Sequence, residues 1–253
     1  MQSPDSTDLS LLPSPIEVWD HTLQWQPNAT QQHQFQQLYE RVIEGNRQLN
    51  LTRIVEPIDF WEKHIWDSLS GIRPWLEEGA IRDQPLAVSD QPLAISEQPL
   101  KIIDLGTGAG FPGLPVAIAL PHAHVTLLDS TRKKIAFVDT VVEELGLQQV
   151  QTICDRAEQI GKQPVHQSAY DLVLIRAVAA VTVCADYALP LLKPDGTAVL
   201  YRGQWSDQER DKLERAIAPM GGKITAIDAF TTPLSQSIRH CVYLQTPLTH
   251  NLE

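Results

Sequence analysis

The sequence contains few cysteines, and they are not arranged in pairs. Its 253 residues include only Cys154, Cys184 and Cys241, an odd number of widely spaced thiols with no C-x-x-C pair. This pattern excludes a disulfide-stabilised secreted scaffold and offers no zinc framework. We therefore expect reduced thiols in a cytoplasmic protein, and no metal cofactor.

The sequence also lacks a long apolar run. No stretch approaches the roughly 20 apolar residues that a helix needs to cross a bilayer. The first ten residues, MQSPDSTDLS, carry acidic residues and proline where a signal peptide would have basic and apolar ones. We expect a soluble protein with no membrane partner.

Basic residues are in deficit. Lysine and arginine number 20 against 31 acidic residues, which gives a net charge of −11. Residues 1–100 hold 6 basic and 15 acidic side chains, so most of the excess lies in the first part of the chain. An acidic total argues against loose, non-specific binding to nucleic acid, which depends on neutralising phosphates. It leaves open the recognition of one structured RNA through a local basic patch.

The first hundred residues divide into three predicted regions. Residues 1–30 are rich in Pro, Ser, Thr and Gln and predict a flexible extension with a short docking helix. Residues 31–76 form a helical region, with one amphipathic helix from 31 ending near Gly45 or Asn46 and another over 58–69. Residues 77–100 contain two seven-residue copies, DQPLAVS and DQPLAIS, and the start of a third, EQPLKII, which extends to residue 103. The proline in each copy excludes a coiled coil, so the first two copies are interpreted as an extended linker or surface insertion and the third as running into the first strand.

Residues 101–253 alternate between apolar runs and helical patterns, which is typical of a doubly wound α/β fold. The strands are expected at 101–105, 126–128, 150–154, 170–175, 197–201, 223–230 and 239–245. Ser130 or Thr131 would cap a helix ending at Gly146, and Lys193–Gly196 would form a turn. The last two strands have no helix between them, which predicts an antiparallel hairpin at one edge of a mixed sheet.

The stretch from Lys101 to Asp129 is the part of the chain most typical of a ligand site. Gly106, Gly108, Gly110 and Gly113 follow the first strand within eight residues, and Asp129 closes the second. Such glycines let backbone N–H groups approach a ligand, and an acidic group at the second strand end is placed to bind a ribose. The pattern predicts an adenosine derivative.

Two cofactor classes fit this turn. Gly108, Gly110 and Gly113 spell the dinucleotide pattern G-x-G-x-x-G, while the run from Asp104 spells D-x-G-x-G-x-G, the S-adenosylmethionine (SAM) pattern. Prolines in the first helical turn remove N–H donors that a pyrophosphate would want, and the terminal hairpin suits a methyltransferase sheet better. SAM is favoured, and an NAD-dependent reductase remains open.

Several motifs together resemble the RsmG (GidB) family. They are DLGTGAGFPG (104–113), LLDSTRKK (127–134), DRAE (155–158), IRAVA (175–179), NLT (50–52) and HIWDSL (64–69). The resemblance runs from about residue 31 to residue 245. It implies a class I SAM-dependent methyltransferase fold, with a seven-stranded mixed sheet behind a small helical region. It also implies methyl transfer to guanine N7 in 16S ribosomal RNA, with the small ribosomal subunit or its RNA as partner.

The resemblance also implies roles for individual residues. Gly106 and Phe111 would line the methionine and methyl end of SAM, Gly108 would also bind the cofactor, and Arg176 would face the reaction site. The remaining cofactor contacts would be Asp129, Ser130, Thr131, Ala157 and Glu158. RNA contacts would come from Arg132, Lys133 and Arg202, the last standing where the family commonly has Lys-Gly. We expect a monomer.

Structural alternatives exist for several of these residues. Phe111 could belong to the core, Asp129 could be a helix cap, and the basic residues 132–134 could be a solvated helix face. His64 is interpreted as a structural histidine rather than a base. Two further functions remain open, a small-molecule methyltransferase and a SAM-binding or nucleotide-binding module without catalysis.

Overall fold

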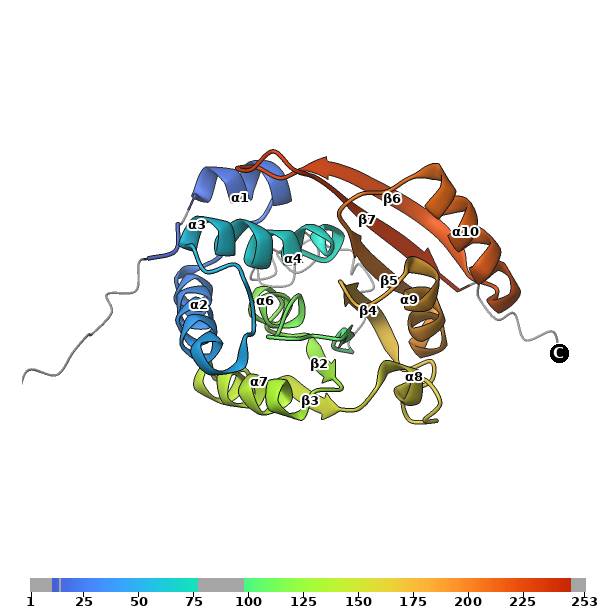
Figure 1. Cartoon of the computed structure of the whole chain (residues 1–253), viewed down its shortest axis with the longest axis horizontal. Coiled ribbons are helices and arrows are strands. Elements are labelled where there is room, and N and C mark those ends of the chain that lie inside the picture. The colour runs from blue at the N-terminus through green and yellow to red at the C-terminus, as the bar shows by residue number, and fades with distance from the viewer. Residues whose placement is uncertain (1–10, 14, 77–97, 247–253) are drawn as a thin grey trace, which may run out of the picture.

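The computed structural model describes residues 11–13, 15–76 and 98–246. The chain folds into a seven-stranded sheet with helices on both faces (Figure 1). None of the helices in these ranges is long and apolar enough to cross a membrane. Most of the repeat predicted over 77–100 lies outside the described residues, as does the start of the predicted extension.

The strand order is β3-β2-β1-β4-β5-β7-β6. The strands are β1 (Lys101–Leu105), β2 (His124–Asp129), β3 (Val150–Cys154), β4 (Tyr170–Arg176), β5 (Leu192–Arg202), β6 (Lys223–Thr231) and β7 (Ile238–Gln245). The first five pair in parallel, and β7 runs antiparallel to both β5 and β6. The predicted mixed sheet with a terminal antiparallel hairpin is confirmed.

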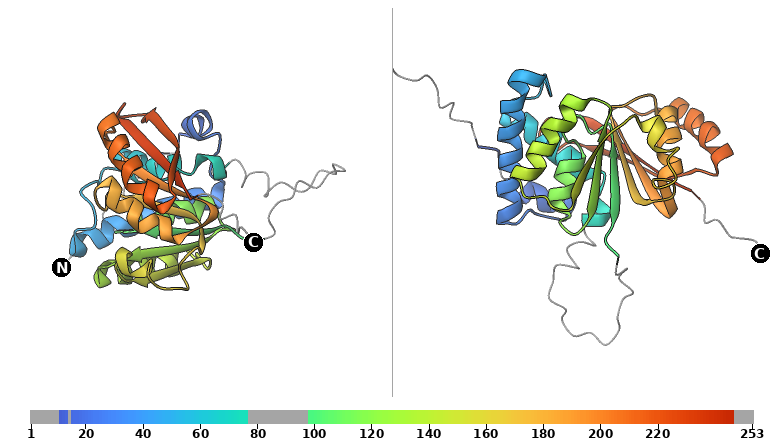
Figure 2. Two further views of the ribbon diagram at one scale, coloured as in Figure 1. Left: turned by 90° about the vertical axis from the view of Figure 1, so that its right-hand side faces the viewer. Right: turned by 90° about the horizontal axis from the view of Figure 1, so that it is seen from below.

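Helices cover the two faces of the sheet separately. The helices are α1 (Ile16–Leu23), α2 (Ala29–Leu49), α3 (Pro57–Phe60), α4 (Asp67–Ser70), α6 (Gly113–Ala119), α7 (Arg132–Glu144), α8 (Ala157–Ile160), α9 (Val181–Ala188) and α10 (Asp207–Ile217). A π-helical stretch, η1 (Trp61–Trp66), joins α3 to α4, and short 3₁₀ turns follow α9 (η2, Leu189–Leu191) and α10 (η3, Ala218–Met220). In Figure 2, α2 and α7 lie on one side of the strands, and α9 and α10 on the other.

Adjacent residues of the central strands contribute to different cores. Ile102 belongs to the cluster beneath α6 and α7, whereas Ile103 belongs to the cluster beneath α9 and α10. Leu174 and Ile175 divide in the same way on β4. Successive side chains of a strand point to opposite faces, so a strand buried on both faces is apolar throughout. This explains why these segments have no polar alternation in the sequence.

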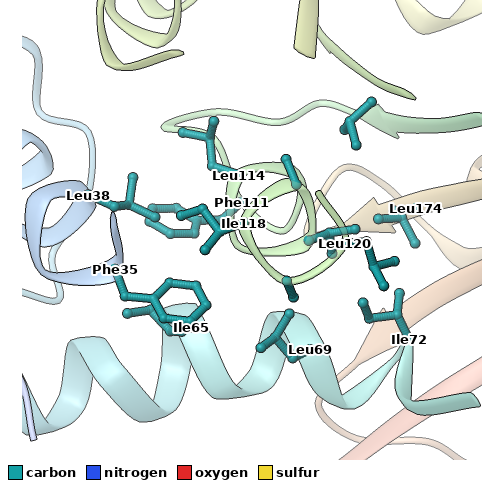
Figure 3. Close-up of a cluster of buried hydrophobic side chains, with 14 of the residues drawn as sticks. Phe35, Leu38, Ile65, Leu69, Ile72, Phe111, Leu114, Ile118, Leu120 and Leu174 are labelled. Atoms are coloured by element: carbon teal, nitrogen blue, oxygen red, sulfur yellow. The ribbon is translucent and has the colours of Figure 1, made fainter. Parts of the chain in front are cut away.

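The N-terminal helices share a core with the sheet domain. Figure 3 shows Phe35 and Leu38 of α2, Ile65 and Leu69 of the η1–α4 segment, and Ile118 of α6 meeting in one apolar cluster. The cluster includes fully buried side chains from all three segments. Helices 29–49 and 57–70 are therefore fixed against the sheet domain.

The prediction that the first long helix ends near Gly45 or Asn46 is wrong. Helix α2 continues through Gly45 to Leu49, and Asn50 caps its C-terminus with a φ of +49°. A Cβ on Gly45 would lie 2.5 Å from Cε2 of Phe137 on α7. This glycine permits the close packing of two helices and does not end one.

The predicted turn at Lys193–Gly196 is also wrong. Strand β5 begins at Leu192, pairs with Tyr170 there, and shifts register before Thr197 pairs with Leu172. Asp195 has a φ of +64° within this irregularity. Lys193–Gly196 therefore forms a bulge inside one strand. Its Pro and Gly are also typical of turns, so the sequence pattern alone does not distinguish the bulge from a turn.

Replacing Leu69 with alanine should destabilise the fold strongly. Leu69 is fully buried between the helical region and α6, so its loss leaves a cavity, and we expect the free energy of unfolding to fall by about 3 kcal/mol. Urea denaturation followed by circular dichroism would measure this. The control is Leu234→Ala, since Leu234 is 42% exposed and its truncation should change stability by less than about 0.5 kcal/mol. Equal effects would contradict the shared core.

Candidate functional site

A cavity of about 390 Å³ lies at the carboxyl ends of β1, β2, β3 and β4. We call it the cofactor cavity. Its lining comprises Gly106, Leu128, Asp129, Ser130, Thr131, Lys134, Asp155, Arg156, Ala157, Glu158, Ala177, Val178, Ala179 and Tyr187. In open α/β sheets ligands bind outside the carboxyl ends of the strands, so the position alone marks a candidate site.

Asp129 holds the glycine turn against the end of β2. One carboxylate oxygen accepts a hydrogen bond from the Gly108 backbone N–H at 3.0 Å, and the other accepts from Thr131 N–H at 2.8 Å. Thr131 occupies the predicted N-cap position of α7, but its side chain makes no capping hydrogen bond, and its own N–H is the group that donates to Asp129. Each oxygen keeps a second lone pair, so a ribose contact stays a prediction.

Gly106 lies at the closest point between the turn and the loop after β4. Its φ is +75°, and an added Cβ would lie 2.5 Å from Cγ2 of Val178. A side chain there would be strained in its backbone conformation and would displace the Val178 loop. The absence of a side chain therefore keeps the entrance of the turn open to the cavity.

Asp104 lies buried beneath the same turn. Its carboxylate accepts a hydrogen bond from the Gly113 backbone N–H at 2.8 Å and joins β1 to the start of α6. Burial raises the pKa of Asp104 to about 6, with hydrogen bonding to Thr107 and Gly113 opposing the rise. Asp104 therefore supports the turn from below and does not line the cofactor cavity.

The residues predicted around the ribose and adenine come together. Ser130, Thr131, Ala157 and Glu158 all line the cofactor cavity, although β2 and β3 bring them from separate parts of the sequence. Glu158 forms an ion pair with Arg156, and its pKa is lowered by hydrogen bonds from its own backbone and from Arg156. The cavity edge thus carries an ionised carboxylate. That these residues contact SAM stays a prediction.

A second cavity of about 720 Å³ adjoins the first. We call it the acceptor cavity. It is lined by Ile54, Lys63, His64, Asp67, Arg176, Ala177, Tyr201, Arg202, Gly203, Gln204, Glu209, Arg239 and His240. Ala177 lines both cavities, and its φ of +56° is unusual for a residue with a side chain. Such backbone strain is often found at functional sites, and here it lies where the two cavities meet.

Arg176 connects the end of β4 to the N-terminal helical segment. Its guanidinium donates to the Lys63 carbonyl oxygen at 2.9 Å and to an Asp67 carboxylate oxygen at 3.2 Å, and lies 3.3 Å from His64 Nδ1. It also lies over the Phe111 ring, 5.6 Å from the centroid. Arg176 lines the acceptor cavity rather than the cofactor cavity, so a direct cofactor contact stays a prediction.

Phe111 lies in the hydrophobic core. It is 5% exposed, stacks on the His64 ring with centroids 4.4 Å apart, and meets Phe60 edge to face. It lines neither cavity, although His64 and Arg176, which it contacts, both line the acceptor cavity. Its predicted place at the methyl end of SAM is thus not reproduced as a cavity-lining position in the described structure.

His64 is held in its neutral form. Its Nε2 lies 2.8 Å from Thr52 Oγ1, and burial, with Arg176 and Lys63 close by, lowers the pKa of His64 to about 3. A neutral, hydrogen-bonded imidazole agrees with the interpretation of His64 as a structural histidine.

The three predicted RNA-contacting residues are not brought together. Arg202 lines the acceptor cavity, where it contacts the Ala179 carbonyl oxygen and Glu209. Arg132 is exposed on α7, and Lys133 lines a separate groove between α2 and α7. Their RNA contacts stay predictions.

Comparison with known proteins agrees with this arrangement. A family model described as GidB, rRNA small subunit methyltransferase G, matches residues 31–83 and 87–241. The chain belongs to this family. The match includes the residues that line both cavities.

Named relatives are similar over nearly their whole length. A ribosomal RNA small subunit methyltransferase G of Nostoc punctiforme is 54% identical over 240 residues, covering 95% of this chain and 92% of the relative. A ribosomal RNA small subunit methyltransferase G of Trichodesmium erythraeum is 48% identical, covering 97% of this chain and 92% of the relative. A crystal structure of the cyclase SpnF superposes with a TM-score of 0.51 at 13% identity, over 88% of this chain and 97% of that one. That likeness concerns the fold alone.

Sequence reasoning missed several cavity residues. Lys134 belongs to the basic residues 132–134, for which the sequence indicated an RNA patch or a solvated helix face, yet it lines the cofactor cavity. Asp67 lies inside the quoted HIWDSL motif, which could have drawn attention to it. Arg239 and His240 had no signal, because they reach the acceptor cavity only through the pairing of His240 with Arg202 across β7 and β5.

Replacing Gly106 with alanine should abolish or strongly weaken SAM binding. The new methyl group would meet Val178 in a left-handed backbone conformation, and we expect at least a tenfold rise in Kd by isothermal titration calorimetry. Gly146→Ala is the matched control, because Gly146 also has a positive φ of +67° but nothing lies within 4 Å of its Cβ position. If both variants bind SAM like the wild type, the assignment of the cofactor cavity is wrong.

His64 should make stability depend on pH. Because its folded pKa of about 3 lies below the usual 6.5, its contribution is present above pH 6.5 and is lost as pH falls. The stability advantage of wild type over His64→Asn should shrink by about 1.4 kcal/mol per pH unit between pH 6 and 4. Urea denaturation at several pH values would measure it, and a constant difference would contradict the buried neutral imidazole.

Proposed function

We propose that this protein transfers the methyl group of SAM to N7 of a guanine in the 16S RNA of the small ribosomal subunit. The observation that carries the proposal is the family match, which spans both cavities. Relatives about half identical over most of their length are named as methyltransferases of small-subunit ribosomal RNA. Two adjoining cavities also fit a reaction with one cofactor and one acceptor.

The cofactor cavity fits SAM chemically. When bound, SAM supplies an electrophilic methyl group on a positively charged sulfur. Gly106 would admit the methionine portion, because it lines the cavity and has no side chain of its own. Gly108 would contact the cofactor from a position outside the cavity lining, where its N–H is bonded to Asp129. Asp129, Ser130 and Thr131 would surround the ribose, and Ala157 and Glu158 the adenine.

Transfer to guanine N7 needs no general base. N7 is a neutral sp² nitrogen with an in-plane lone pair, so no proton has to leave before it attacks the methyl carbon. This agrees with the neutral, hydrogen-bonded state of His64 in the acceptor cavity. The task of the protein is to align N7 with the methyl group across the Ala177 junction, and positioning of this kind contributes several kcal/mol.

The acceptor cavity suits RNA despite the acidic chain. Its lining includes four cations, contributed by Lys63, Arg176, Arg202 and Arg239, and two carboxylates, Asp67 and Glu209. A local positive excess attracts phosphates even where the total charge is negative. The partner would be the small subunit or its RNA, met in the cytoplasm by a monomer.

A cleavage assay tests the proposal. Small-subunit RNA from cells lacking the protein should resist borohydride and aniline, which cut at N7-methylguanine. Incubation with the purified protein and SAM should restore one cleavage product, whereas Gly106→Ala should restore little. The proposal would be contradicted if incubation with the wild-type protein and SAM produced no new cleavage product in this RNA. Transfer of labelled methyl to a small molecule and not to RNA would also contradict it.

A further inference from the structure

Asp67 is an acidic residue in a cavity that is otherwise mainly basic. It begins α4, directly after η1, and its carboxylate lines the acceptor cavity while the side chain is only 13% exposed. Burial raises the pKa of Asp67, and Arg176 and Arg239 oppose the rise. A buried carboxylate among cations that would otherwise attract RNA calls for an explanation.

The contacts of Asp67 leave hydrogen-bonding capacity unused. One oxygen lies 3.2 Å from Arg176 and the other 3.7 Å from Arg239, longer than the 2.7–2.9 Å of strong charge-assisted bonds. Glu62, on the same helical segment, differs in this respect. Its carboxylate is 1% exposed and accepts from the backbone N–H groups of Leu234 and Ser235, which fixes the β6–β7 loop. Glu62 has a complete structural role, whereas Asp67 faces a cavity.

Arg176 also keeps donors for a ligand. A guanidinium carries five N–H donors, and in the described residues Arg176 makes three hydrogen bonds, to Lys63, Asp67 and His64. Both N–H groups of Nη1 are used, so the unused donors of Arg176 are one N–H on Nη2 and the N–H on Nε, and Arg176 and Asp67 line the same cavity in contact with each other. Donor and acceptor are adjacent, which is a pattern that a nucleobase edge can match.

Guanine and adenine differ in this pattern. Both have an N7 lone pair, so the chemistry of methyl transfer does not separate them. Beside N7, guanine has the O6 acceptor, whereas adenine has an amino donor. Continuing round the ring, guanine offers N1–H and the 2-amino group as donors, and adenine offers the N1 acceptor. A hydrogen-bond donor facing position 6 and a carboxylate facing position 1 match the edge of guanine. On adenine they would meet a donor and a lone pair, respectively, so neither hydrogen bond could form.

We propose that Asp67 reads the target guanine, accepting hydrogen bonds from N1–H and the 2-amino group while Arg176 donates to O6. This rests on the proposed function, since it names the residues that select the base in the same cavity. Arg239 holds the second oxygen of Asp67 in place. Adenine would place its amino donor against Arg176 and its N1 lone pair against the carboxylate. The site would then leave buried polar groups unpaired, which gives strong discrimination.

Inosine at the target position tests this role. Inosine lacks only the 2-amino group, so the wild-type protein should methylate an inosine-substituted small-subunit RNA on the order of 10- to 100-fold less efficiently in kcat/KM. In Asp67→Ala the preference of guanine over inosine should fall to near one, because the group that senses the amino group is gone. A purely structural role for Asp67 would lower both rates and leave the ratio unchanged. That outcome, or a wild type without preference, would overturn the proposal.

Two further variants protect the test. Asp67→Asn keeps the shape of the side chain, and the preference of this variant for guanine over inosine should also fall. It replaces Asp67→Ala in the test if the alanine variant does not fold. Asp59→Ala is the matched control, because Asp59 is a carboxylate on the same helical segment that pairs with Lys63 at 2.7 Å and does not line the cavity. It should keep the wild-type ratio, and SAM binding would verify the fold of each variant. Failure of the wild type to methylate guanine-containing RNA would instead overturn the proposed function.

Discussion

The contact of Arg176 with the 63–67 segment is the interaction on which the acceptor cavity depends. A single guanidinium at the end of β4 reaches a backbone carbonyl, a carboxylate and an imidazole of a segment more than a hundred residues earlier in the chain. Because an arginine is always charged, every group around it has to be an acceptor or a π face. The neighbours of Arg176 fit this requirement: His64, which burial and the nearby Arg176 keep neutral, the Asp67 carboxylate at 3.2 Å, and the Phe111 ring beneath the guanidinium.

The two cavities have different origins in the chain. The cofactor cavity is built by the strand ends and loops of the sheet domain, and Asp129 keeps its glycine turn in place. The acceptor cavity also needs the N-terminal helical segment and the start of β7. Glu62 ties these two together through the β6–β7 loop, so the wall of the acceptor cavity is held from both sides. The helical region is thus part of the site as well as part of the core.

Sequence patterns predicted the fold better than they predicted the site. Strands such as β1 and β3 were placed correctly, because a buried apolar run and its flanking turns are local signals. The helix end predicted at Gly45 was wrong, because this glycine makes room for Phe137 of α7, about ninety residues later in the chain. The residues predicted around the ribose and adenine line one cavity because parallel strands end at one edge, and their contact with SAM stays a prediction. Arg239 escaped prediction because it joins the site through an antiparallel pairing that no local pattern encodes.

Because N7 of guanine needs no deprotonation, the main task of the enzyme is to bind and align the correct base. A nucleophile that needs no deprotonation leaves no role for a base, and the cavity accordingly contains a neutral histidine already bonded to Thr52. Adenine has the same nucleophilic atom, so selectivity has to come from atoms that do not react. Among the polar groups of the acceptor cavity, Arg176 follows β4 next to Ala177 and contacts the Asp67 carboxylate, so these two residues offer a donor and an acceptor together. The arrangement that fixes the N-terminal helix to the sheet is then also the arrangement that distinguishes one purine from the other.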